Sequence, residues 1–202
     1  MSIEALMRAV PPPQKPLESF AGPWAQIETE IGSPLPQDYK DYARLYGSGY
    51  FLQFLHVDTP RTGNPNIRLE KQVPSMCAMF AQFDGDDRPY PLWPEPGGLM
   101  PFGGTDNGDT LFWLRRGTPD EWPVVLADRG GWEFELHECC MTDFLAGLAL
   151  GAIRPTIFPD LLLPVDCPFA PSTPWVWVPD EYRASARMRL TPGPPNPWRW
   201  RS

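Results

Sequence analysis

The sequence predicts an α+β fold in which a short, mainly antiparallel sheet is flanked by helices at both ends. Three observations predict this class: apolar residues recur at helical spacing near both ends of the central region, short apolar and aromatic runs lie between them, and turn sequences separate those runs. The 202 residues, of which 42% are hydrophobic, are enough for one domain with a buried core. Helices on either side of a set of antiparallel strands are typical of α+β domains.

Composition divides the chain into three parts. Residues 1–19 form a Pro-rich leader, in which residues 1–10 make a helical turn or two and bury little. Residues 20–153 contain the dense apolar pattern and form the core domain. Residues 154–202 form an extension rich in Pro and Trp. We expect its last dozen residues to be mobile, because the prolines between positions 192 and 197 prevent regular hydrogen bonding.

Two helices are predicted at the start of the core domain. Residues 23–32 begin with a proline, which is tolerated in the first helical turn, and end with a glycine. Residues 36–47 repeat this arrangement, and Asp38 lies near the positive end of that helix. The apolar stripe of the second helix consists of Tyr39, Tyr42, Ala43 and Tyr46.

The next elements are a strand and a third helix. Residues 50–57 are aromatic and apolar, lie between Gly49 and Pro60, and predict one buried strand. The third helix is predicted to begin at Pro74, with Leu69 and Val73 just before it. Its apolar residues are Met76, Phe80 and Phe83.

An antiparallel meander and a closing helix complete the core domain. An Asn-Gly turn precedes the strand at residues 109–114, and residues 123–127 and 132–136 supply the next two strands. We expect Trp132, Phe134 and Leu136 to face inward. The closing helix is predicted from Met141, Phe144, Leu145 and Leu148. Residues 156–158 and 175–178 are each predicted to add an edge strand or to lie as a strap across the core.

Three stretches of this sequence resemble the SUKH superfamily, which includes the Smi/Knr-like cell-wall regulators. They are similar to the family's helix after Leu-Pro, to its Gly-Asp pair before a strand and to its closing helix. The stretches are residues 35–40 (LPQDYK) followed by 46–49 (YGSG), residues 102–109 (FGGTDNGD) and residues 141–145 (MTDFL). One departure is Ser48, which stands where the family often has the Gly of an Asn-Gly turn.

The resemblance implies a non-catalytic protein-binding domain. Members of the family are bacterial immunity proteins that neutralise toxins by binding them, and the resemblance implies this role first. The alternative that it implies is a regulatory scaffold that recruits a protein or peptide partner, as in the fungal cell-wall regulators. The resemblance brings no catalytic residue and no cofactor.

Charge narrows the class of partner. The chain has 17 Lys and Arg against 25 Asp and Glu, which gives a net charge of −8. Such a field repels nucleic acid and anionic lipid and attracts a basic protein surface, so a basic toxin domain is the expected partner. The sequence has no apolar stretch of the roughly 20 residues that a membrane span needs. Its first residues lack the pattern of a secretory signal, so we expect a cytoplasmic protein.

Few residues have a pattern that suits catalysis or metal binding. His56 lies inside an apolar run and His137 follows another, and neither has the spacing of metal ligands, so structural roles are predicted for both. The acidic turns at residues 84–87 and 106–109 lack the alternating ligands and the final Glu of a calcium loop. We therefore predict no catalytic residue, no metal and no cofactor. All four cysteines, Cys77, Cys139, Cys140 and Cys167, are predicted to be reduced.

Six residues are candidates for contact with a partner. The aspartates are expected to imitate phosphates towards a basic partner, as a nuclease toxin would be. Trp93 lies among prolines and is either an exposed anchor or a ring that caps the core, since rigid aromatic side chains are common at binding hot spots. The candidates are Asp84, Asp86, Asp87, Trp93, Asp106 and Asp109.

Overall fold

The computed structural model describes residues 3–83, 88–159 and 167–172 of the chain. Within these residues, seven strands form one sheet in the order β6-β5-β4-β3-β2-β1-β7, and all neighbouring strands are antiparallel. The strands are β1 (Gly49–Phe51), β2 (Leu55–Val57), β3 (Leu99–Thr105), β4 (Thr110–Leu114), β5 (Val124–Ala127), β6 (Phe134–His137) and β7 (Phe169–Pro171). The helices are α1 (Glu4–Ala9), α2 (Trp24–Ile31), α3 (Gln37–Leu45), α4 (Leu69–Phe80) and α5 (Met141–Ala149), with 3₁₀ turns η1 (Pro65–Ile67) and η2 (Pro119–Glu121). The predicted α+β class is confirmed.

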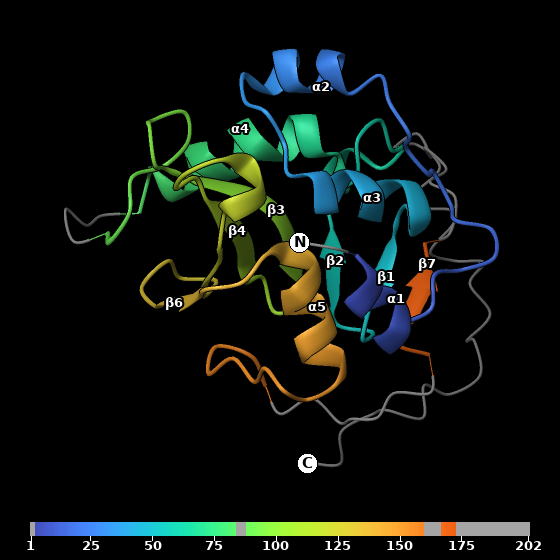
Figure 1. Ribbon diagram of the computed structural model, residues 1–202. Helices are drawn as coiled ribbons and strands as arrows, with labels where there is room; N and C mark the ends of the chain where they lie inside the picture. Colours follow the sequence, from blue (N-terminus) through green and yellow to red (C-terminus); the bar gives the residue numbers. More distant parts are fainter. Residues whose placement is uncertain (1–2, 84–87, 160–166, 173–202) are drawn as a thin grey trace, which may run out of the picture.

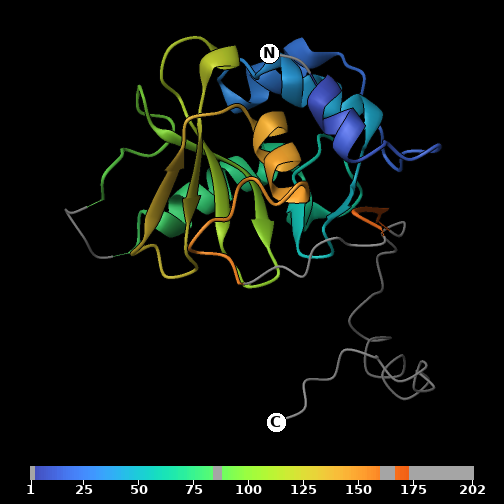
Figure 2. The same ribbon diagram turned by 60° about the horizontal axis from the view of Figure 1, so that its bottom comes forward.

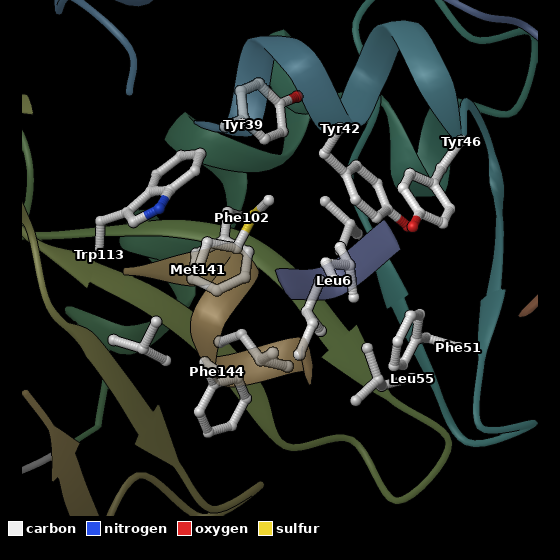
Figure 3. Close-up of a cluster of buried hydrophobic side chains, with 14 of the residues drawn as sticks. Leu6, Tyr39, Tyr42, Tyr46, Phe51, Leu55, Phe102, Trp113, Met141 and Phe144 are labelled. Carbon is white, nitrogen blue, oxygen red and sulfur yellow. The ribbon is translucent and has the colours of Figure 1, made fainter. Parts of the chain in front are cut away.

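The larger hydrophobic cluster fills the space between one face of the sheet and the helices α1, α3 and α5 (Figure 1). Figure 3 shows Leu6 of α1, two tyrosines of α3 and Tyr46 just after it pointing towards the same interior as Phe144 of α5. From the sheet, Phe102 and Trp113 point towards these side chains. Helices from both ends of the described chain therefore cover one side of the sheet.

A smaller cluster lies on the opposite face of the sheet, under α4. Phe80 of α4 packs there with Phe112, at a ring-centroid distance of 5.1 Å. Leu111 and Trp113, on either side of Phe112 in β4, belong to the larger cluster, because successive residues of a strand point to opposite faces. Figure 2 shows α5 and α4 on opposite sides of the sheet. Both faces of β4 are therefore covered, and all five of its residues are buried.

The single strand predicted over residues 50–57 is wrong, because this segment is a hairpin of β1 and β2. Leu52 and Gln53 have φ values of 53° and 54°, so the backbone turns there, and Phe51 pairs with Leu55. Residues other than glycine, asparagine and aspartate rarely occupy this region of φ. The turn therefore had no sequence signal.

The third helix begins five residues earlier than predicted, at Leu69 instead of Pro74. Pro74 lies inside the helix on its exposed side. A proline there removes one backbone hydrogen bond. Because this side faces solvent, water can bind the carbonyl of Glu70 that the missing N–H would have bonded.

Strand β3 was not predicted, although it lies at the centre of the sheet. It contains Pro101 and two glycines, which are poor strand formers, and its register shifts between Pro101 and Gly103. A Cβ on Gly103 would lie 2.3 Å from the backbone oxygen of His56. Glycine is required there because β2 and β3 approach closely.

The meander β4-β5-β6 is confirmed, but only two of the three residues predicted to face inward do so. Phe134 and Leu136 pack half-buried against the smaller cluster. Trp132 precedes β6 and is 76% exposed, so its inward orientation is wrong. The chain turns between Asp128 and Glu133, so Trp132 belongs to the turn and does not follow the alternation of inward and outward side chains along the strand.

The leader contributes to the core, contrary to the prediction that it buries little. Leu6 and Val10 are fully buried. Helix α1 packs against α5, and the hydroxyl of Tyr46 donates a hydrogen bond of 2.5 Å to the backbone oxygen of Val10. An apolar stripe on such a short helix is a weak signal, and its burial depends on a surface that α5 and α3 supply.

The closing helix α5 is confirmed, and its first turn is bound to α3. Asp38 accepts hydrogen bonds from the backbone N–H of Thr142 at 3.0 Å and from its hydroxyl at 3.1 Å. The same carboxylate accepts the N–H of Tyr39 at 2.7 Å. One buried carboxylate therefore stabilises the N-terminal ends of two helices.

The described part of the extension lies across the core. Residues 156–158 form a strap rather than an edge strand: Phe158 packs on Phe54, and Thr156 donates two hydrogen bonds to Glu135. Strand β7 pairs with β1 and was not predicted. The second predicted edge strand or strap, residues 175–178, lies outside the described residues, as do the last dozen residues.

Candidate functional site

The two described candidate aspartates lie in the turn between β3 and β4, but in different environments. Asp109 is 5% exposed, and its carboxylate accepts the hydroxyl of Thr105 at 2.8 Å. Its own N–H donates to the same hydroxyl oxygen at 3.1 Å, which closes the turn. Asp106 is exposed, and partial burial raises the pKa of its carboxyl. Only Asp106 presents its carboxylate to solvent, and contact of either aspartate with a partner stays a prediction.

The remaining acidic candidates, Asp84, Asp86 and Asp87, lie outside the described residues. Residue Phe83 precedes them, and its ring packs on Phe80 at a centroid distance of 5.2 Å.

Trp93 lies in the loop that leads into β3. Its N–H donates to the backbone oxygen of Leu99 at 2.9 Å, and the peptide bond to Pro94 is cis. The ring is half-buried against the larger cluster, and its indole N–H is buried without a hydrogen-bond partner in the part of the chain that the structure describes. This packing favours the core-capping alternative over the exposed anchor.

The pair of side chains that most resembles a catalytic site is His56 and Asp58 at the end of β2. Their Nε2 and Oδ1 atoms are 3.6 Å apart. Burial raises the pKa of Asp58 to about 8 and lowers the pKa of His56 to about 4. Both groups are therefore neutral between these values, and neither is a charged acid or base near neutral pH. Sequence reasoning missed Asp58, which lies just after β2, because no local pattern indicated that its carboxyl would be buried.

Burial also shifts the pKa of other potentially reactive groups. Burial lowers the pKa of His137, whose ring packs on Phe144 at 4.9 Å. Cys77, Cys139, Cys140 and Cys167 are free thiols. Burial raises the pKa of Cys77 to about 11 and that of Cys140 to about 12, so both are protonated thiols at neutral pH.

The described residues contain neither a group suited to a metal ion nor a helix suited to a membrane. Within residues 3–83, 88–159 and 167–172, no three His, Cys, Asp or Glu side chains are grouped so that they could hold a metal ion. Over the same ranges, no helix has the length and hydrophobicity that crossing a membrane requires.

Comparison with known proteins identifies a family. The model of a SUKH family described as SMI1-KNR4 cell-wall matches residues 22–145, which is more than half of the chain. The matched segment runs from just before α2 into α5, and it leaves out α1 and β7. No curated protein and no solved structure matches the chain.

Proposed function

Because the chain belongs to the SUKH superfamily, in the family described as SMI1-KNR4, we propose that it is an immunity protein that neutralises a cognate toxin by direct binding. The observation that carries the proposal is the family match over residues 22–145. The family is associated with protein–protein interaction and is generally non-enzymatic. Binding without catalysis is therefore the function expected of this chain.

Charge and the environment of the titratable groups support this proposal. The net charge of −8 favours a basic partner, because opposite fields raise the rate of encounter. His56 and Asp58, the pair most like a catalytic site, are neutral near pH 7. A protein that works by blocking a basic active site needs an acidic surface and no reactive groups.

Growth of a host that expresses the protein encoded next to this one tests the proposal. Expression of the neighbour alone should arrest growth, and co-expression of this chain should restore it. Titration calorimetry should then show tight one-to-one binding between the two purified proteins. A neighbour that is toxic but is neither bound nor neutralised by this chain would contradict the immunity role.

The acidic residues define a second test of the same proposal. The variant with Asn at Asp84, Asp86, Asp87 and Asp106 should bind the toxin more weakly and with less dependence on salt. Asp41→Asn on α3 removes one acidic charge elsewhere and measures how much a single charge contributes through the overall field. Unchanged affinity and salt dependence in the fourfold variant would exclude phosphate imitation by these residues.

A regulatory scaffold is the second candidate, and the cell-wall description of the matching family favours it. In this case the Pro-rich ends would dock the partner. Removal of residues 1–19 does not test this idea cleanly, because Leu6 and Val10 belong to the core. Removal of residues 190–202 alone is the better test: a scaffold should lose its partner, and an immunity core should keep its toxin.

A further inference from the structure

Among the described residues, strand β6 lies at one edge of the sheet and pairs only with β5 (Figure 2). In an antiparallel pair, residues alternate between those whose N–H and C=O face the partner and those whose groups face away. The N–H of Asp128 donates to the oxygen of Glu133, so these two residues are a hydrogen-bonded pair. The next hydrogen-bonded pair, two residues away on each strand, is Leu126 with Glu135. Glu135 and His137 therefore bond to β5, and the N–H and C=O of Phe134 and Leu136 point away from the sheet.

These four outward backbone groups have no hydrogen-bond partner among residues 3–83, 88–159 and 167–172. The pairing of β4 with β5 leads to the same assignment. The N–H of Leu114 donates to the oxygen of Pro123, so the backbone groups of Pro123 and Val125 face β4 and those of Val124 and Leu126 face β6. A row of unpaired N–H and C=O groups at a sheet edge is the feature to which an extended peptide binds as an added strand.

Apolar side chains accompany this edge. Phe134 and Leu136 are only half-buried, whereas all residues of the neighbouring strand β5 are fully buried. Trp132, directly before the strand, is the most exposed of the large hydrophobic side chains in the described chain, at 76%. Exposed tryptophan beside unpaired backbone groups is suited to partner contact, because it buries a large area at little cost in side-chain entropy.

The charges at this edge select the kind of strand that can bind. Glu133 and Glu138 are exposed, and Arg116 is paired with Glu138 at 2.6 Å. Suppose that β6 paired symmetrically with β6 of a second copy through all four unpaired backbone groups. Phe134 of one copy would then lie opposite Leu136 of the other, and the two Glu135 side chains would lie opposite each other. Directly opposed like charges destabilise strand pairing. The edge therefore disfavours self-pairing and favours a basic strand.

We propose that the edge of β6 binds an extended segment of a protein partner, in which basic residues alternate with apolar ones, as an additional strand of the sheet. The inference rests on the proposed protein-binding function and names the place and the chemistry of the contact. Alternation follows from the strand period of two: apolar residues extend the row of Phe134 and Leu136, and basic residues lie beside Glu133 and Glu135.

Selection from a displayed library of random peptides, each about twelve residues long, against the full chain tests the proposal. The recovered peptides should alternate Lys or Arg with β-branched or aromatic residues. A selected peptide at saturation should slow amide hydrogen exchange of Phe134 and Leu136 by about tenfold or more. No recovered binder, acidic or Pro-rich binders, or unchanged exchange at both amides would overturn the proposal. The proposal would also be overturned if, without peptide, exchange of these two amides slowed as the protein concentration rose, because a second copy would then be the occupant of the edge.

A pair of variants at one position separates backbone pairing from side-chain contact. Leu136→Pro removes an outward N–H and leaves the β5 ladder intact, because proline is tolerated on edge strands where its N–H would face solvent. It should weaken binding of the selected peptide by about tenfold, whereas Leu136→Ala, which keeps the N–H, should weaken it by about threefold or less. Equal loss in the two variants would contradict pairing through the backbone. If Leu136→Pro does not fold, the exchange experiment on the unaltered chain decides.

The two proposals fail in distinguishable ways. If the neighbouring toxin is neutralised and bound while the amides of Phe134 and Leu136 exchange as in the free protein, the edge inference is wrong and the immunity role stands. If selected peptides protect these amides while the neighbour is neither bound nor neutralised, the binding edge stands and the immunity role is wrong.

Discussion

Single buried polar residues determine much of the chemistry of this molecule. Asp58 is 3% exposed, and its Oδ1 atom accepts no hydrogen bond within the described part of the chain. The sequence predicted a structural role for His56 but did not indicate that a carboxyl group would be buried beside it. Burial was the missing information, because it depends on Tyr39, whose hydroxyl donates to the backbone oxygen of Asp58 from another element.

Asp58 should make the folded protein less stable as the pH rises from about 6.5 to about 8. In the unfolded chain this carboxyl ionises with its ordinary pKa of about 4. Burial raises its pKa in the folded protein to about 8, so the folded state keeps a proton that the unfolded state has released. The free energy of unfolding therefore falls across this range. His56 has the opposite effect only below about pH 6.5, because burial lowers its pKa to about 4.

Asp58→Asn removes this titration at nearly unchanged size. Urea unfolding at about pH 6.5 and about pH 8 should show the variant losing less stability over this interval than the unaltered protein, by on the order of 1 kcal/mol. Asp41→Asn, at a residue paired with Arg44 on the surface, is the control and should keep the original pH profile. A variant at Asp58 that kept the original slope would show that Asp58 is not the titrating group.

At the scale of elements, the sequence predicted helices best where residues next to their ends mark the boundaries. Prolines and glycines marked the limits of α2 and α3, and the helical repeat marked α5. The contact between Asp38 and Thr142 joins residues 104 positions apart and had no local signal. Strand β3 and the turn at Leu52 were missed for the same reason: their conformations are maintained by neighbours in the sheet.

Helix α1 is the clearest case of an element that is stable only through its tertiary contacts. It has six residues, fewer than an isolated helix needs in water. Leu6 is fully buried in the larger cluster against α5, so Leu6→Ala should lower the free energy of unfolding by about 2 to 4 kcal/mol. Urea denaturation followed by circular dichroism measures this loss.

Arg8→Ala on the same helix provides the control, because Arg8 is exposed. It should change the free energy of unfolding by less than about 0.5 kcal/mol. Equal and small effects of both substitutions would mean that α1 does not contribute to the core, and residues 1–19 could then be removed without loss of stability.

For the whole molecule, the sequence predicted the fold class and the family, whereas contact of its candidate residues with a partner stays a prediction. Asp106 is exposed as a contact residue must be, whereas Asp109 closes a turn and Trp93 packs on the core. The edge of β6 was not predicted as a site, because the order of strands in a sheet follows from pairing between distant segments. Trp132 was a visible signal but was assigned to the core, since the predicted strand began at Trp132, whereas β6 begins two residues later at Phe134.

Net charge is a property of the whole molecule, and it should govern how fast a basic partner associates. At a net charge of −8, raising the salt concentration from about 0.05 to about 0.5 M should lower the association rate of a basic selected peptide by about tenfold and change its dissociation rate little. Glu133→Gln beside β6 should lower the association rate by a small factor, and Glu30→Gln on α2, which lies away from β6, should lower it less, because salt screens distant charges (Figure 1). Only Glu133→Gln should also raise the dissociation rate, because only Glu133 lies where the peptide binds. Stopped-flow measurement of both rates tests this, and an association rate independent of salt would show that apolar contacts, not the acidic field, drive the encounter.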